Sequence, residues 1–71
     1  MTGRTYGVTE IVGTSTESWE RAAATAVERA SKTLRDLRVA EVVKLDVEIH
    51  DGQVRAYRAR LEISFKLEDP A

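Results

Sequence analysis

The chain has 71 residues, 42% of them apolar, and its 11 basic and 12 acidic side chains give a net charge of −1 at pH 7. This balance provides no electrostatic reason to bind nucleic acid or an anionic membrane, so neither is expected as a partner. The sequence has no cysteine, which excludes disulfides and cysteine metal sites, and its apolar runs are too short to span a bilayer.

Residues 4–12 predict a first strand, because β-branched and aromatic residues are mixed there with polar ones. Gly13 is expected to end this strand and to allow a sharp turn. Thr14 or Ser15 can then cap a helix, and Thr14 has capping-box spacing to Glu17. These signals place the start of the helix at residue 15.

Residues 15–36 predict one amphipathic helix, around which the rest of the chain is organised. Its apolar and small residues recur at helical spacing and are Trp19, Ala22, Ala23, Ala26, Val27, Ala30 and Leu34. Charged side chains occupy the opposite face. Trp19 is expected to pack on the apolar face.

Residues 39–50 and 54–67 predict two further strands. In the first of these, the odd positions are mostly apolar and should share one face, and Glu41 interrupts that face. Asp51-Gly52 between the two strands predicts a two-residue hairpin turn. Residues 68–71 are expected to form a polar tail.

The predicted order is β-α-β-β, an α+β fold in which a three-stranded antiparallel sheet covers one helix. A single domain over residues 1–71 is expected. A chain this short buries only a small core and the sheet leaves open edges, so association with further copies is expected. No signal peptide is visible, which favours a cytoplasmic location.

Three stretches carry a resemblance to a known family: Ile11-Val12-Gly13-Thr14-Ser15, Val39-Ala40-Glu41-Val42 and the segment from Leu61 to Glu68, separated by the alanine-rich helix. Together they resemble the dodecins over nearly the whole chain. The resemblance implies a sheet wrapped part-way around the helix and a homododecamer that forms a hollow sphere with 23 symmetry. It also implies non-enzymatic binding of flavins and, in some bacterial members, of coenzyme A.

The positions that bind flavin in the family differ here. Val39 stands where a tryptophan stacks on the flavin ring, and Arg58 where a glutamine contacts the ring edge. Asp46 replaces a basic residue that meets the ligand phosphate in some members, and only Lys66 matches a basic position. Valine cannot supply aromatic stacking, and an aspartate repels phosphate. Weak or absent flavin binding is therefore predicted.

The same substitutions resemble a flavin-poor branch of dodecins described as calcium-binding. Asp46 and Glu48 alternate onto one face of their strand, and symmetry copies of both could supply the six to eight oxygens that Ca²⁺ takes. The alternative is that they form cross-strand pairs with Arg58 or Arg60. The lack of EF-hand loop spacing favours this alternative.

The leading predicted function is that of a cage that binds and sequesters a ligand. A divalent cation is the leading ligand and a small anionic metabolite is the second. No tightly bound cofactor is expected. A flavin-binding storage or buffer protein is the alternative. An enzyme is not expected, because no nucleophile motif or glycine-rich phosphate loop is present and His50, beside a turn, is expected to be solvated.

Arg58 and Arg60 could bind an anion, although a charge-paired surface is favoured. Glu41 either faces a subunit junction or pairs with an arginine such as Arg38 or Arg60.

Overall fold

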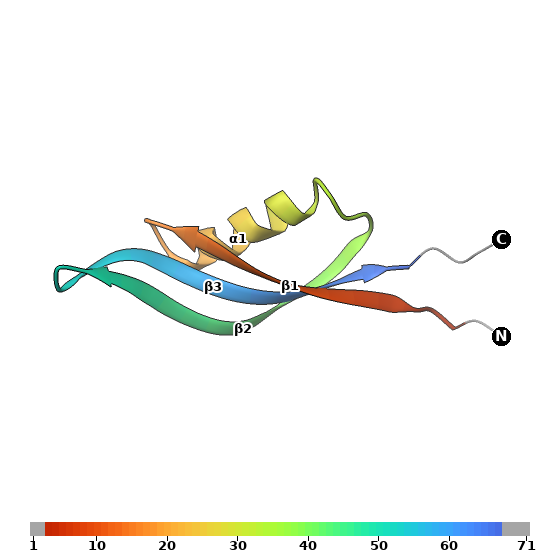
Figure 1. Cartoon of the computed structure of the whole chain (residues 1–71). Coiled ribbons are helices and arrows are strands. Elements are labelled where there is room, and N and C mark those ends of the chain that lie inside the picture. The colour runs from red at the N-terminus through yellow and green to blue at the C-terminus, as the bar shows by residue number, and fades with distance from the viewer. Residues whose placement is uncertain (1–2, 68–71) are drawn as a thin grey trace.

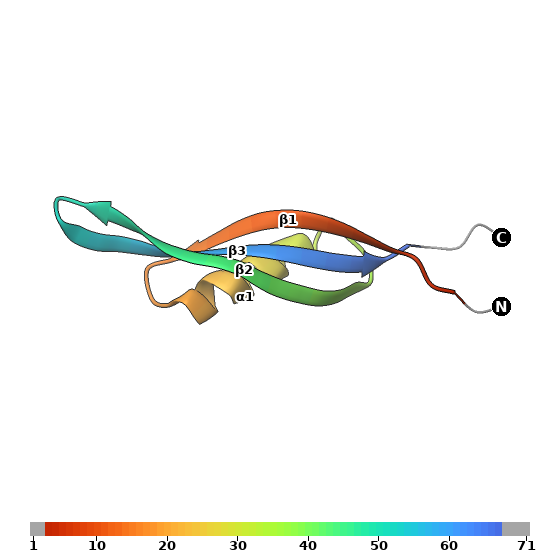
Figure 2. The same cartoon turned by 90° about the horizontal axis from the view of Figure 1, so that it is seen from below.

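The computed structural model describes residues 3–67, so the predicted tail at 68–71 lies outside the described residues. The elements are β1 (Tyr6–Ser15), α1 (Trp19–Ala30), β2 (Leu37–His50) and β3 (Gln53–Lys66). The strands form an antiparallel sheet in the order β1-β3-β2, and α1 lies on one face of it, mainly across β1 and β3 (Figures 1 and 2). The predicted α+β class and β-α-β-β order are confirmed.

The predicted start of the helix is wrong. β1 continues through Thr14 and Ser15, which pair with β3, so neither residue caps the helix. The N-cap is Ser18, whose side-chain oxygen accepts a hydrogen bond from the backbone N–H of Arg21 at 3.0 Å. The capping-box spacing between Thr14 and Glu17 therefore does not mark the start of the helix.

Gly13 does not end the first strand either, but lies inside it opposite Ala59. A Cβ atom added at Gly13 would overlap the backbone carbonyl oxygen of Ala22 and lie 2.9 Å from the Cβ of Ala26. Gly13 is thus a point of close approach between strand and helix. Its missing side chain allows α1 to pack directly on the backbone of β1.

The helix also ends earlier than predicted, at Ala30 instead of residue 36. The next turn tightens into shorter-range hydrogen bonds, such as that from the Thr33 N–H to the Ala30 carbonyl at 3.1 Å. Asp36 has a φ of 57°, which ends the segment in a left-handed conformation. Leu34 nevertheless packs against the core, so its helical spacing marked burial without marking a helix.

The core is small and rich in alanine. Its buried members are Ala22, Ala26, Ala30, Ala59, Leu61 and Ile63. Of the described residues, only Leu61 and Ile63 are large, fully buried side chains. Apolar side chains of β2 stay largely exposed: Val39, Val42, Val43, Leu45 and Ile49. The single chain therefore covers β3 well, β1 in part and β2 poorly.

The hairpin between β2 and β3 forms as predicted. Asp51 and Gly52 both have positive φ, at 50° and 74°, as a primed two-residue turn requires. This end of the hairpin extends past the start of α1 (Figure 1). Among residues 3–67, no helix is long and apolar enough to cross a membrane.

The predicted alternation of β2 is wrong, because the register between β2 and β3 shifts at three places. Val42 pairs with buried Leu61, so it shares the helix side of the sheet. Glu41 pairs with exposed Glu62 and lies on the opposite side, here called the helix-free face. Glu41 therefore does not interrupt an apolar surface. The irregular positions shift the phase of the pattern along the strand.

Candidate functional site

The clearest polar arrangement in the described chain is an ion pair on the helix-free face. Asp46 of β2 and Arg58 of β3 are register partners. The Arg58 Nε donates to Asp46 Oδ1 at 2.7 Å and its Nη2 donates to Oδ2 at 2.8 Å. Both carboxylate oxygens are thus engaged in the bidentate geometry that suits a guanidinium. The predicted alternative of a cross-strand pair is confirmed for Asp46.

The electrostatics of this pair are set mainly by its hydrogen bonds. Those from Arg58 hold the pKa of Asp46 below its ordinary value, and the charges of Arg58, Lys44 and Arg60 act in the same direction. Partial burial opposes them. The same hydrogen bonds raise the pKa of Arg58. Asp46 is therefore a carboxylate, not a carboxylic acid, at neutral pH.

Trp19 ties the start of α1 to the same stretch of β2. Its indole Nε1–H donates to the backbone carbonyl of Asp46 at 3.0 Å. Its ring meets Tyr57 edge-on, with 5.1 Å between the ring centroids and 72° between the planes. Trp19 still keeps 38% of its surface exposed, so it packs only in part.

The four positions that the sequence predicts to correspond to the flavin site share the helix-free face but fall into two groups. Val39 pairs with Ser64, and Lys66 lies beside it at that end of β3. Asp46 and Arg58 lie six β3 residues away, about 20 Å at the rise of a strand. One chain therefore does not bring the four together. A small ligand that touched both groups would have to lie between copies.

The proposed metal donors, Asp46 and Glu48, are neighbours on one face of β2. Glu48 is exposed and pairs in register with Ala56, two positions beyond the Asp46–Arg58 pair. Carboxylate oxygens are the donor type that Ca²⁺ prefers, so the chemistry of the two residues fits. Two carboxylates do not fill a calcium shell, and residues 3–67 contain no group of three or more acidic, histidine or cysteine side chains placed to hold a metal. Further donors would have to come from other copies.

Two charged rows on the helix-free face were not found from the sequence. Glu10, Glu62 and Glu41 are aligned across β1, β3 and β2, and the next pair along β3 and β2 is Arg60 with Lys44. No ion pair joins Glu41 to an arginine within the described chain. These rows can be identified only from the strand register, because the irregular positions of β2 decide which of its residues lie opposite Glu62 and Arg60.

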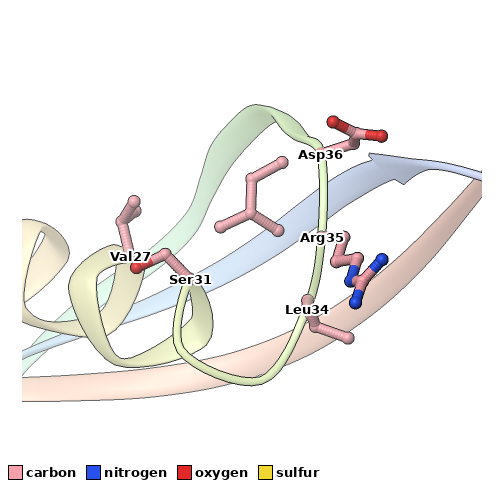
Figure 3. A pocket seen from close by; sticks show the side chains of 6 residues that line it. Val27, Ser31, Leu34, Arg35 and Asp36 are labelled. Carbon is pink, nitrogen blue, oxygen red and sulfur yellow. The ribbon is translucent and has the colours of Figure 1, made fainter.

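Two hollows lie away from this face. The larger, about 610 Å³, lies between the end of α1 and the start of β2. It is lined by Val27, Ser31, Leu34, Arg35, Asp36 and Leu37. Figure 3 shows the polar ends of Arg35 and Asp36 pointing away from Val27. This hollow contains none of the predicted site residues.

The second hollow is an apolar groove between α1 and β2, of about 360 Å³. It is lined by Trp19, Glu20, Ala23, Val42 and Leu45. Four of its five lining residues are apolar. The groove is where the helix fails to cover β2.

Comparison with known proteins gives a consistent result. The family model described as "Dodecin" matches residues 5–68. The chain is 47% identical over 62 residues to the "Calcium dodecin" of Mycobacterium tuberculosis, which is 87% of each chain. The dodecin structure from Streptomyces coelicolor has a TM-score of 0.91 and 44% identity, over 99% of this chain and all of that one.

The crystal structure of the calcium-chelating antigen calcium dodecin from M. tuberculosis, described as having a novel calcium-binding site, is also similar. It has a TM-score of 0.80 and 44% identity, and the match covers 94% of this chain and 99% of that one.

Proposed function

Because this chain belongs to the dodecin family, we propose that it is a non-enzymatic binding protein that assembles as a homododecamer and binds calcium. The observation that carries the proposal is its 47% identity to the calcium dodecin over most of both chains. The ligand would lie on the helix-free face, where Asp46 and Glu48 are the donors each copy contributes.

Assembly is supported by what a single chain leaves uncovered. The exposed apolar residues of β2 include Val39 and Ile49, with 63% and 69% of their surfaces exposed. β2 is also an edge strand, so one side of its backbone lacks a sheet partner among residues 3–67. Apolar edge surface of this kind is typical of a protein interface.

Calcium is supported over flavin by the residues present. Val39 offers no flat aromatic surface for a flavin ring, and the guanidinium of Arg58 is already paired with Asp46. The hard oxygen donors of Asp46 and Glu48 suit Ca²⁺, and each Asp46 oxygen keeps a lone pair that its hydrogen bond from Arg58 does not use. His50, the one histidine, is the last residue of β2, and its Nε2 lies 3.3 Å from the Asp51 carboxylate in the turn, which supports no catalytic role for it.

Native mass spectrometry of the full chain tests assembly and ligand together. The expected spectrum is a twelve-subunit species that gains mass in calcium steps when CaCl₂ is added. A species that stays monomeric would contradict assembly, and an assembled species without calcium adducts would contradict the ligand.

Calorimetric titration with CaCl₂ tests the residues. Asp46→Asn and Glu48→Gln are expected to weaken binding, because each removes one donor charge from every copy. Asp51→Asn is the matched control, since it removes the same charge in the turn, and asparagine tolerates positive φ. Equal binding by the wild type and by the Asp46 and Glu48 variants would remove both residues from the site.

A further inference from the structure

The turn between β2 and β3 is the one place in the described chain where an aspartate is followed directly by a glycine. The Asp51 side chain is 88% exposed, and the basic side chain near its carboxylate, that of His50, is itself 66% exposed. A Cβ atom added at Gly52 would meet no other atom within 4 Å. The turn lies beyond the start of α1, so the helix does not cover it (Figure 1). The carboxylate and the peptide that follows it are therefore open to water.

This pair of residues has an intrinsic reactivity. The backbone nitrogen of Gly52 can attack the Asp51 Cγ, because glycine has no Cβ atom to crowd the approach. The new N–Cγ bond closes a succinimide ring, and one carboxyl oxygen leaves as water with the proton of the carboxyl group and the proton of the amide. Water then opens the ring. Cleavage of the N–Cγ bond restores aspartate, whereas cleavage of the bond from nitrogen to the main-chain carbonyl carbon yields isoaspartate. No oxidant or cofactor is consumed.

We propose that Asp51 is a modification site, at which aspartate converts spontaneously to isoaspartate through a succinimide with Gly52. Ring closure requires the Asp51–Gly52 peptide to rotate out of the primed turn, in which the two residues have φ of 50° and 74°. Among residues 3–67, no hydrogen bond holds the Asp51 carbonyl in place. The nearby pair of Ile49 with Val54 is 69% and 53% exposed. Local opening costs least where few buried contacts resist it, so the turn can reach the reactive conformation.

The two other aspartates that the structure describes are held against the same reaction. The backbone carbonyl of Asp46 accepts a hydrogen bond from the indole N–H of Trp19 at 3.0 Å. The backbone carbonyl of Asp36 accepts one from the N–H of Lys66, also at 3.0 Å. Each hydrogen bond fixes the peptide that would have to rotate, and a residue with a branched side chain follows each of these aspartates. The structure therefore singles out Asp51.

The modification changes the hairpin itself. Isoaspartate routes the backbone through the side-chain carbons, which adds one backbone atom to a turn that closes on two residues. The pairs next to the turn, His50 with Gln53 and Ile49 with Val54, are expected to loosen. This inference goes beyond the proposed function, because it requires neither calcium nor a partner molecule. The fraction of modified chains would record the age of the protein.

The test is peptide mapping of the full-length protein after weeks of storage at neutral pH in heavy-oxygen water, in samples whose circular dichroism still matches that of fresh protein. Each passage through the succinimide inserts one heavy oxygen atom. Tryptic cleavage after Lys44 and Arg55 places Asp46 and Asp51 in one peptide, so fragmentation compares the two directly. Isoaspartate and heavy oxygen are expected to accumulate at Asp51, severalfold above Asp46. Asp51→Glu, which keeps the charge but would need a larger ring, should show neither.

Three results would overturn the proposal. The first is an Asp51 that gains no isoaspartate in the stored wild type beyond the level of the fresh sample. The second is equal accumulation at Asp46, which would mean that the folded structure does not select the site. The third is an unchanged level of isoaspartate in Gly52→Ala, because a methyl group beside the attacking nitrogen should slow ring closure severalfold.

Discussion

Replacing Gly13 by alanine tests the contact between strand and helix on which the fold depends. The new methyl group would overlap the carbonyl oxygen of Ala22 and lie 2.9 Å from the Cβ of Ala26. A backbone carbonyl cannot rotate away as a flexible side chain could. Ala22 is also fully buried in the core, so α1 would have to move away from β1 as a unit.

The expected loss follows from this geometry. Inserting a methyl group into a well-packed core costs about 1–3 kcal/mol, and a clash with backbone belongs at the upper end of that range. A domain of this size loses about 4–8 °C of melting temperature for each kcal/mol. Gly13→Ala is therefore expected to melt more than about 10 °C below the wild type.

The assay is thermal unfolding followed by circular dichroism at one fixed protomer concentration, since assembly makes the melting temperature depend on concentration. Gly52→Ala is the control. Gly52 has a φ of 74° with no other atom within 4 Å of an added Cβ, so it should lose only about 1 kcal/mol from backbone strain. A Gly13→Ala protein that melts at or above the temperature of Gly52→Ala would refute the close approach of α1 to β1.

Three other variants test the core, the indole contact and the ion pair. Leu61→Ala removes a fully buried side chain and should lower the free energy of unfolding by about 2–5 kcal/mol in urea titration. Trp19→Phe loses the hydrogen bond to the Asp46 carbonyl and should cost about 1 kcal/mol in the same assay, whereas an unchanged midpoint would argue against that bond. Because pairing with Arg58 lowers the pKa of Asp46 in the folded chain, its stabilising effect is present above the ordinary value of 3.8 and is lost as the pH falls through the lower, folded-state pKa. Urea titrations at acid pH should show less of this loss in Asp46→Asn, and parallel curves for both proteins would contradict the pairing.

The order of elements could be read from the sequence because each signal was local. Helical spacing identified α1, and Asp51-Gly52 identified the hairpin from two residues that adopt positive φ. The end of the helix was misplaced because Leu34 keeps helical spacing while it packs from beyond the helix, and its start because Thr14 and Ser15 belong to β1. Gly13 was misread because a glycine that permits a turn and one that permits close packing look alike in a sequence.

The candidate site was predictable only in part. The pairing of Asp46 with Arg58 was one of the stated alternatives, since opposite charges lie on adjacent strands of a hairpin. Which arginine it pairs with depends on the register. The register shifts at three places, two with an extra residue in β2 and one with an extra residue in β3, and none of the extra residues is glycine or proline. The same shifts hid the alignment of Glu41 with Glu62 and Glu10.

The strand order β1-β3-β2 has a consequence for synthesis on the ribosome. β1 is made first, but its sheet partner β3 is the last of the three strands to emerge. Until β3 emerges, β1 has no neighbouring strand, and α1 lacks one of the two strands that it mainly packs on. The nascent chain can close the β2–β3 hairpin locally, whereas β1 can join the sheet only after β3 has been made, a delay during which chaperones have the most reason to bind it.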